Sequence, residues 1–427
     1  MANLTRRDFL KRTAAASAGL LASGYLPASS RLLAQEGVTG TIDYWHNFIA
    51  EFVFDGFEVV LENFRQQYPD ITVNPLTIPN ADFMTKFTTS VVGGDAPDTT
   101  MVQPDRVPDM VAVGGLQDLT ERVENSDLME KIPADRWAGA TLDGRIYGVP
   151  SFMFVDWMYY RADWFEEAGI EPPTTFEEFT EAAIALTDPA NGRYGFGMRG
   201  GSGGQGFVTQ IIEAFGSPIV DENGQPAMDF DKAVEGLRWY TDLHTVHGVV
   251  PPSVVDDSFR QLMEAFQTDQ TAMLWHHTGS LAEMRTVLGD EGTFMTAIRP
   301  AGPAGLIANA TPSYNGISMP EPENEEAAWA WVSYWAEVDT QVTFLEETGY
   351  FPTSALVADD ERVQSNPLYA AALATVNEVG PPTTFPGGPG WEQTVVLPAF
   401  QRTLLGEITP EDAVELMMEG LEEAVNG

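Results

Sequence analysis

Hydrophobic residues recur with two different periods in the first part of the chain. Short apolar runs at 41–45 and 71–73 are typical of buried strands. The apolar residues between them follow helical spacing: Phe57, Val60, Leu61, Phe64 and Tyr68. Pro69 comes directly after and cannot continue a helix, so the pattern predicts strand, helix and strand from 41 to 73.

The same alternation continues towards residue 103. A helix is predicted over 81–92, and the pair Gly93-Gly94 is expected to end it. A further short strand is predicted at 98–103. Strands that alternate with helices favour an α/β architecture with largely parallel sheets.

Later elements are predicted from local signals. Residues 157–160 are typical of a strand, and a helix is expected to open at Thr174, where Glu177 completes a capping box. Further helices are expected to begin near Asp231, Asn324 and Pro410. The tryptophans of the helix after Asn324 are predicted to pack in a core: Trp329, Trp331 and Trp335.

Composition adds exclusions to this picture. The chain has 427 residues, 22 basic and 63 acidic side chains, a formal charge of −41 and no cysteine. Single cores stop growing at about 250–300 residues, so more than one lobe is expected. The lack of cysteine excludes disulfides, cysteine-ligated metals and thiol nucleophiles. The acidic excess argues against nucleic-acid partners, because phosphates are bound by Lys and Arg.

The N-terminus has the features of an export signal. Arg6-Arg7 and Phe9-Leu10-Lys11 precede a mildly apolar stretch, 14–26, which is too short to span a bilayer. The segment resembles a twin-arginine export signal, and a chain without cysteine carries no lipid anchor. We assign 1–34 to this signal. Its removal leaves 17 basic and 62 acidic residues, a formal charge of −45.

Short motifs between residue 40 and the C-terminus share an order and spacing. They are Tyr44–Asn47, Gly93–Asp98, Gly144–Pro150, Tyr160–Gly169, Tyr194–Gly201, Gln270–Met273 and Tyr350–Thr353. Together they resemble the extracellular solute-binding proteins of sugar-type ABC importers, the family that includes maltose-binding proteins. The resemblance covers nearly the whole chain after the signal.

The resemblance implies an α/β fold of two lobes, the type II periplasmic-binding-protein fold. Each lobe holds a mostly parallel sheet flanked by helices, and crossover hinge strands join the two. We expect an N-terminal lobe of 38–150 with 317–357 and a C-terminal lobe of 151–316 with 358–427. Hinges are expected near Pro150–Asp156, Ser313–Met319 and Leu356–Asp360.

Such a protein binds and delivers a solute without turnover. The implied partners are one small solute, a mono- or oligosaccharide, and the transmembrane subunits of an ABC permease. No cofactor, metal or nucleic acid is implied, and the protein is expected to be a monomer in the periplasm or outside the cell. Another polar solute remains an alternative: a polyol, a glycerol phosphate, an amino-sugar or a sugar acid.

The family pattern also implies solute contacts at particular positions of this chain. They are Trp45, Asn47, Asp95, Gln103, Phe154, Arg199, Gly200, Gly201, His277, Tyr314, Asn315 and Trp391. Aromatic rings stack on sugar faces, and planar polar groups bond the hydroxyls. Each position also has a structural alternative, such as a buried Trp45, a turn residue at Asp95 or a core Phe154.

The C-terminal part of this set has two distinctive features. Arg199 beside two glycines combines five fixed donors with open backbone amides, which fits a hydroxylated or anionic ligand. The chain departs from many relatives at 275–277, where the aromatic is Trp275 and two histidines occupy the loop.

An exported cofactor enzyme is the main rival from another class. Gly201–Gly206 fits G-x-G-x-x-G literally, precedes the apolar helix 207–215, and is followed by Asp221. This pattern is the formal fingerprint of a nicotinamide or flavin oxidoreductase. Its strand is short, carries Arg199 and lies in the middle of the chain, which argues against the enzyme.

Other chemistries have weaker signals. His244 and His247 lie three residues apart without a second cluster, so a metal site is not indicated. Glycoside hydrolysis needs two carboxylates that face each other across a cleft. With 62 acidic residues after the signal, some pair always matches this requirement, so the sequence gives no support for a hydrolase. The chain has few lysines and many acidic residues, which indicates a surface adapted to a saline medium outside the cell. At molar ionic strength charges are screened over about 3 Å, so the acidic side chains repel one another less.

Overall fold

The computed structural model describes residues 37–426 except 49–50, 290–291, 320–321 and 380–384. The predicted export signal, 1–34, lies outside the described residues. The chain from Val38 onward forms one compact unit. An 8-stranded sheet runs through it in the order β2-β1-β3-β10-β6-β8-β7, with β9 paired to β6.

The strands of this sheet divide into parallel groups and crossing strands. They are β1 (Gly40–His46), β2 (Ile71–Thr77), β3 (Thr99–Val102), β6 (Val149–Arg161), β7 (Tyr194–Gly197), β8 (Thr271–His277), β9 (Phe294–Ala297) and β10 (Ala310–Ile317). β1 is parallel to β2 and β3, and β7 is parallel to β8. The pairs made by β6 and β10 are antiparallel. A separate two-stranded sheet joins β4 (Thr141–Leu142) and β5 (Arg145–Ile146).

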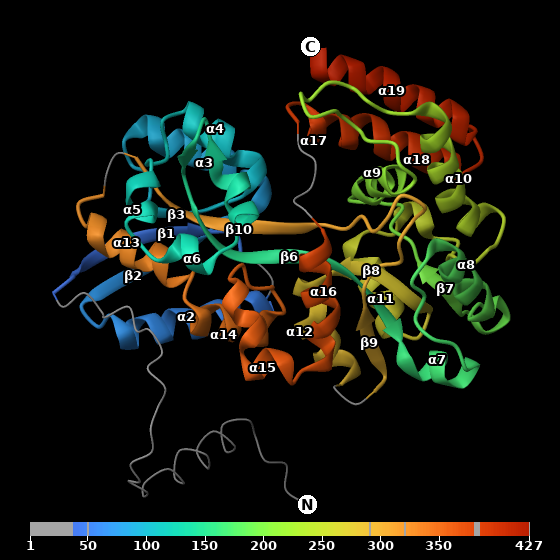
Figure 1. Ribbon diagram of the computed structural model, residues 1–427, viewed down its shortest axis with the longest axis horizontal. Helices are drawn as coiled ribbons and strands as arrows, with labels where there is room; N and C mark the ends of the chain where they lie inside the picture. Colours follow the sequence, from blue (N-terminus) through green and yellow to red (C-terminus); the bar gives the residue numbers. More distant parts are fainter. Residues whose placement is uncertain (1–36, 49–50, 290–291, 320–321, 380–384, 427) are drawn as a thin grey trace, which may run out of the picture. The chain divides into compact units, whose positions relative to one another are not determined.

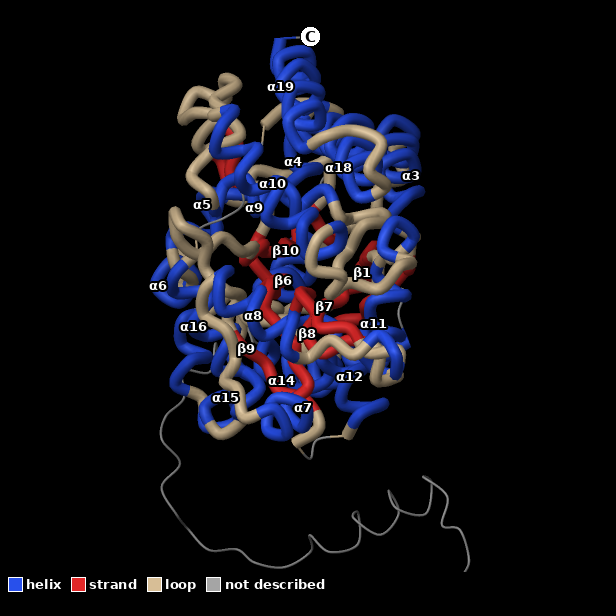
Figure 2. The backbone as a smooth tube through the Cα atoms, turned by 90° about the vertical axis from the view of Figure 1, so that its right-hand side faces the viewer, coloured by secondary structure: helices blue, strands red, loops and turns tan. Residues whose placement is uncertain are grey.

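Helices cover the strands on both faces, as Figures 1 and 2 show. Around β1–β3 these are α2 (Glu51–Gln67), α3 (Asn80–Gly93), α4 (Val107–Ala112), α5 (Thr120–Glu124), α6 (Leu128–Lys131), α13 (Glu325–Tyr334) and α14 (Val338–Thr348). The others are α7 (Ala162–Ala168), α8 (Phe176–Ala185), α9 (Gln205–Ala214), α10 (Phe230–Thr245), α11 (Phe259–Gln267), α12 (Leu281–Leu288), α15 (Glu361–Gln364), α16 (Ala370–Glu378), α17 (Gly388–Trp391), α18 (Leu397–Leu404) and α19 (Pro410–Asn426).

The elements predicted before residue 103 are confirmed within a few residues. Helix α3 ends where Gly94 adopts φ +73° and donates its N–H to Val91 O at 3.1 Å. This left-handed conformation favours glycine, which explains the clear end signal in the sequence. The capping box predicted at Thr174 and Glu177 is wrong by one residue. Thr175 caps α8 by accepting from the Glu178 N–H.

Separate hydrophobic clusters lie at the two ends of the sheet. One gathers side chains of β1, α2 and α13, with Phe57 and Trp331 fully buried. Another gathers β7, α10 and α18 around Phe196, Tyr240 and Phe400. The predicted burial of Trp331 and Trp335 is confirmed, while Trp329 is only half-buried.

A third cluster connects the two ends. It packs Trp157 of β6 and Phe266 of α11 against Leu345 of α14. Helix α14 therefore contributes to the packing of both groups of strands. Met153 also forms a β-bridge with Phe351, which ties the segment after α14 to β6.

The crossing strands β6 and β10 lie where two hinges were predicted. Their ladder has an irregularity between Ser313 and Tyr314. The third predicted crossing, Leu356–Asp360, is largely a 3₁₀ turn at Ala355–Asp359.

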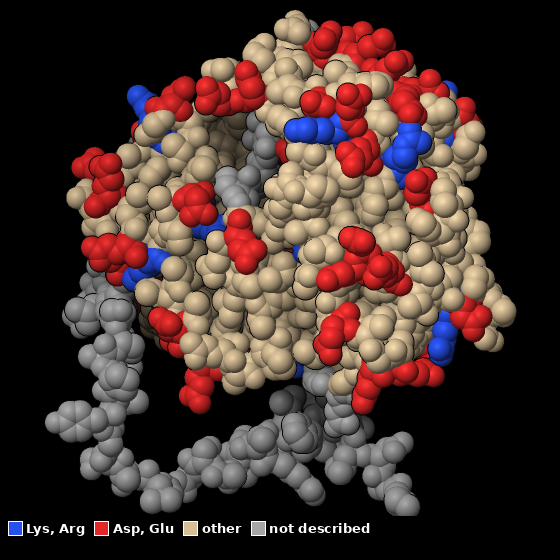
Figure 3. All heavy atoms as spheres, turned by 45° about the vertical axis from the view of Figure 1, so that its right-hand side comes forward, with Lys and Arg blue, Asp and Glu red and all other residues tan. Residues whose placement is uncertain are grey.

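Acidic side chains are spread over the face drawn in Figure 3, with few basic ones among them. On this face the acidic side chains therefore lie on the surface of the folded protein. No helix among the described residues is long and apolar enough to cross a membrane.

Candidate functional site

The carboxyl ends of β1 and β3 bring several polar and aromatic side chains together. Trp45 is 7% exposed, and the Lys86 ammonium lies 4.9 Å from its ring centre. Asn47 Nδ2 donates to Asn80 Oδ1 at 3.0 Å, and Arg106 donates to the same oxygen. Parallel strands present their following loops at one edge, which explains why Trp45 and Asn47 meet partners from distant segments.

Asp95 lies apart from this group. Its side chain is exposed after the end of α3, and its backbone N–H donates to Ser90 O at 2.9 Å. The placement corresponds to the structural alternative, a turn residue that ends a helix.

Three predicted residues next to the crossing strands face protein partners. Gln103 Nε2 donates to Ser313 Oγ at 3.2 Å. The Tyr314 hydroxyl donates to Arg136 O at 3.0 Å, and Asn315 Oδ1 accepts from the Tyr44 hydroxyl at 2.8 Å. Tyr314 and Asn315 are each 1% exposed, so their roles in solute contact stay predictions.

Phe154 and His277 lie together next to the crossing region. Phe154 is half-buried and meets the rings of Tyr350 and His277 edge-to-face, with centroids 4.9 and 5.5 Å away. His277 Nδ1 is buried without a hydrogen-bond partner among the described residues. Burial and then the charge of Arg199 lower the pKa of His277 to about 4, so the ring is neutral at pH 7.

Arg199 folds back over the glycine-rich loop that follows it. Its Nε donates to Ser202 O at 2.7 Å. Gly203 adopts φ +91°, and a Cβ there would lie 2.2 Å from the guanidinium carbon, so glycine makes room for this side chain. Burial lowers the pKa of Arg199, and Asp156 and Tyr240 oppose that effect.

The glycine loop uses its amides within the protein. Gly201 N donates to Asp257 O, Gly203 N to Gln205 Oε1 and Gly204 N to Gly201 O. Gly200 O accepts from Gln401 Nε2 at 3.0 Å. A pyrophosphate site needs such amides free to donate to phosphate, so this geometry does not support the dinucleotide interpretation.

A cavity of about 1220 Å³ is lined by residues from several elements of the fold. Pro104 and Asp105 line it from the turn after β3, and α9, the loop 306–309 and the segment 385–392 line it from other sides. Its volume exceeds that of an ordinary small-molecule pocket, about 300–1,000 Å³. A mono- or oligosaccharide would fit within it.

Trp391 is the predicted contact residue that lines this cavity. Its indole N–H donates to Met417 O at 2.8 Å, and the side chain is 2% exposed. The bond to α19 fixes the ring within the wall. Among the described residues, the lining has five carboxylates and no Lys, Arg or His: Asp105, Asp109, Glu213, Glu378 and Glu392.

A buried polar group behind the cavity wall was missed by the sequence reasoning. Gln210 lines the cavity, and its Nε2 donates to Asp156 Oδ2 at 3.3 Å. Arg299 donates to Gln210 Oε1 and lies 3.7 Å from the same Asp156 oxygen. A lone acid in the apolar run Val149–Tyr160 was the signal that could have drawn attention to it.

Burial dominates the electrostatics of this pair. It raises the pKa of Asp156, against the opposing effects of Arg299 and hydrogen bonds from Asn309 and Gln210. It also lowers the pKa of Arg299, which Asp156 opposes. No group of acids and histidines among the described residues is arranged to hold a metal ion.

Comparison with known proteins shows which family this chain belongs to. Residues 52–342 match the family model described as bacterial extracellular solute-binding protein. A maltotriose-binding protein of Pyrococcus abyssi is 21% identical over 338 residues, 77% of this chain and 70% of the relative.

Two solved structures share the fold. The GacH receptor of Streptomyces glaucescens, solved unliganded and with acarbose, has TM-score 0.79 at 20% identity, covering 91% of this chain and 99% of its own. An ABC transporter solute-binding protein of Thermotoga lettingae with α-D-tagatose has TM-score 0.77 at 22% identity, covering 91% and 100%. The predicted two-lobed α/β fold is confirmed by this likeness.

Proposed function

This chain belongs to the bacterial extracellular solute-binding protein family, and we propose that it captures a mono- or oligosaccharide for an ABC importer. The observation that carries the proposal is the cavity of about 1220 Å³, lined from both sides of the crossing strands. A relative named for maltotriose and structural neighbours solved with acarbose and α-D-tagatose support a sugar as the solute.

Capture follows from the two-lobed fold. The lobes, 38–150 with 317–357 and 151–316 with 358–427, close on the solute by bending at the crossing segments β6 and β10. Closure removes water from around the sugar, which strengthens its hydrogen bonds to the walls. The closed complex then presents the solute to the transmembrane subunits of the permease. The protein works as a monomer and does not turn its ligand over.

The proposed solute contacts come from both sides of the crossing strands, and Trp391 is the one among them that lines the cavity. Trp45, Asn47 and Gln103 serve the N-terminal side, and Phe154, Arg199, His277 and Trp391 serve the C-terminal side. Rings of Phe154 and Trp391 cover apolar sugar faces, while amide and guanidinium groups bond hydroxyls. Asp95, Gly200, Gly201, Tyr314 and Asn315 complete the proposed set.

Export follows from the N-terminal segment. Residues 1–34 direct the folded chain through the twin-arginine pathway, and the released protein works in the periplasm or outside the cell. The chain contains no cysteine, so the protein is not a lipoprotein.

Calorimetric titration of the protein from residue 35 with sugars, polyols and sugar acids tests the function. Maltotriose, tagatose, glucose and mannitol form the first panel. We expect micromolar or tighter binding of at least one sugar, with a change in tryptophan fluorescence on closure. Failure of every sugar and polyol to bind would overturn the proposal.

A further inference from the structure

Gln210 occupies an unusual position in the cavity wall. It lies on α9, lines the cavity and is only 6% exposed. Both ends of its carboxamide already have protein partners, because Oε1 accepts from Arg299 and Nε2 donates to Asp156. A carboxamide has two donor and two acceptor positions, so one N–H and one lone pair remain.

The partners of Gln210 are themselves fixed. The Arg299 guanidinium carbon lies 4.3 Å from the ring centre of Trp275 and 5.2 Å from that of Phe207. Asp156 Oδ2 accepts from Asn309 N at 3.2 Å, and Asp156 N donates to Asn309 O at 2.9 Å. The carboxamide orientation is therefore set by Asp156 on β6 and Arg299 in the segment after β9, while Asn309, just before β10, holds Asp156.

This arrangement presents a neutral polar surface to the cavity. Arg299 and Asp156 oppose each other's charge behind the wall, and Gln210 and Asn309 line it. One free donor next to one free acceptor matches a hydroxyl group, which both donates and accepts. The carboxylates of the lining, including Glu213, repel an anionic solute.

We infer that Gln210 contacts the solute and that this wall of the cavity selects an uncharged hydroxylated group over a carboxylate or phosphate. Asp156 and Arg299 are positioning residues, which hold the Gln210 carboxamide in its orientation. This inference rests on the proposed function and decides among the solutes that it leaves open. It gives the ion pair of Asp156 and Arg299 a role in solute binding, in addition to its place in the fold.

Matched solutes test the selectivity. Glucose and glucuronate differ by one oxidised CH₂OH, and mannitol and mannitol 1-phosphate differ by one phosphate; maltotriose is a further neutral probe. In whichever pair the neutral member binds, we expect it to bind at least about tenfold more tightly than its anionic partner. Tighter binding of either anion would overturn the inference and leave the proposed function standing. Failure of every sugar and polyol to bind, tagatose included, would overturn both.

Variants test the residues. Gln210→Met keeps side-chain length and removes both polar ends, and Gln210→Ala is a second variant should the first misfold. We expect about tenfold weaker binding of the neutral probe from the lost hydrogen bonds. Circular dichroism and thermal unfolding verify that each variant is folded. Wild-type affinity in a folded Gln210 variant would overturn the contact.

A double-mutant cycle separates positioning from general structure. Asp156→Asn should weaken binding of the neutral probe, and it should add little further loss in the Gln210→Met background. Asp163→Asn, in an ion pair remote from the cavity, is the control and should keep wild-type affinity. Additive losses for Asp156 and Gln210 would show that Asp156 acts independently, which would overturn the positioning role.

Discussion

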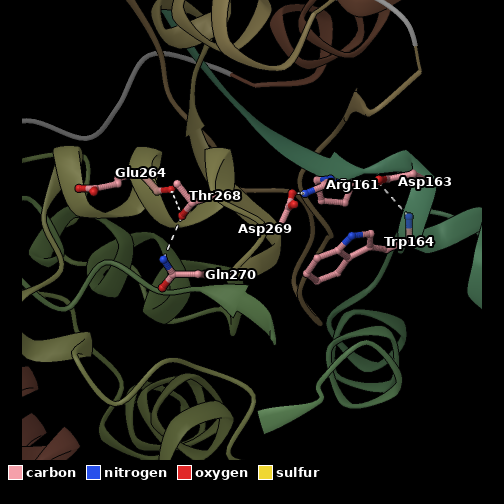
Figure 4. Close-up of polar contacts among 7 residues, drawn as sticks. All are labelled: Arg161, Asp163, Trp164, Glu264, Thr268, Asp269 and Gln270. Atoms are coloured by element: carbon pink, nitrogen blue, oxygen red, sulfur yellow. Dashed lines mark hydrogen bonds and ion pairs between the residues drawn. The ribbon is translucent and has the colours of Figure 1, made fainter. Parts of the chain in front are cut away.

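Two arginine–aspartate clusters share β6 but differ in how their charges meet solvent. At its carboxyl end Arg161 pairs with Asp163 and Asp269 and lies 5.1 Å from the Trp164 ring centre (Figure 4). The Arg161 side chain is 5% exposed, whereas Asp163 and Asp269 are 43% and 61% exposed. In the other cluster Arg299 is 2% and Asp156 13% exposed, so Arg299 is buried and Asp156 is largely shielded from water.

The balance of burial and pairing is opposite in the two clusters. Burial acts to lower the pKa of Arg161, but Asp163 and Asp269 outweigh it and the pKa is raised. Burial prevails at Arg299 and Asp156, where it disfavours both charges. The Arg161 cluster therefore stabilises a strand end with hydrated acids. The Arg299 pair contributes little to stability, because desolvation offsets its attraction.

Removing one member of the buried pair should produce the largest effect. Arg299→Ala leaves Asp156 buried without its counter-charge, so we expect a loss of about 3–5 kcal/mol in the free energy of unfolding. Arg161→Ala leaves acids that water can solvate, and its loss should be about 1–2 kcal/mol. Urea unfolding of both variants measures the difference. Equal losses would remove the distinction between the clusters.

The pH dependence of stability should include a contribution from His277. Burial and Arg199 lower the pKa of His277 to about 4, and its unfolded value is about 6.5. The unfolded chain therefore binds a proton between these values that the folded chain does not, and stability is lost as pH falls through this window.

The free energy of unfolding of His277→Gln should therefore fall less on acidification than that of the wild type, by up to about 3 kcal/mol. Asp156, whose pKa burial raises, acts in the opposite direction in both proteins, so comparing their slopes isolates the histidine. Urea unfolding between about pH 7 and 4.5 is the measurement. Parallel slopes for wild type and variant would refute the assignment.

Aromatic substitutions should separate affinity from stability. Phe154→Leu removes a half-buried ring beside His277, and we expect about tenfold weaker sugar binding with a small change in stability. Phe165→Leu alters a side chain of α7 that is 2% exposed, so it should lower stability and leave affinity unchanged. Calorimetry and thermal unfolding of the pair check this. Loss of affinity in both variants would contradict the separation.

Salt should give the smallest difference. Asp163 is 43% exposed, so its pairing with Arg161 is screened, and the loss from Asp163→Asn should shrink by about 0.5 kcal/mol between low salt and molar salt. The loss from Asp156→Asn should stay nearly constant because solvent ions do not reach the buried pair. Unfolding of both variants at the two salt concentrations provides the values, and equal salt responses would argue against the difference in burial.

The sequence by itself determined elements whose signals are local. The helical spacing from Phe57 to Tyr68 and the left-handed Gly94 gave α2 and the end of α3, because neighbouring residues alone set those conformations. The order of short motifs also identified the family. Adjacent threonines at 174–175 and glutamates at 177–178 left the start of α8 ambiguous by one residue. Packing of Phe176 and Phe179 in the core accompanies the observed register.

Only the tertiary structure decided which residues meet at the cavity wall. Strand β6 runs from Val149 to Arg161, but just 157–160 was predicted, because a strand buried on both faces lacks alternation. Gln210 lies 54 residues from Asp156 and 89 from Arg299. No local pattern links such distant positions. They meet because the fold brings α9 and the segment after β9 to β6, where each charged group is paired with partners from distant parts of the chain.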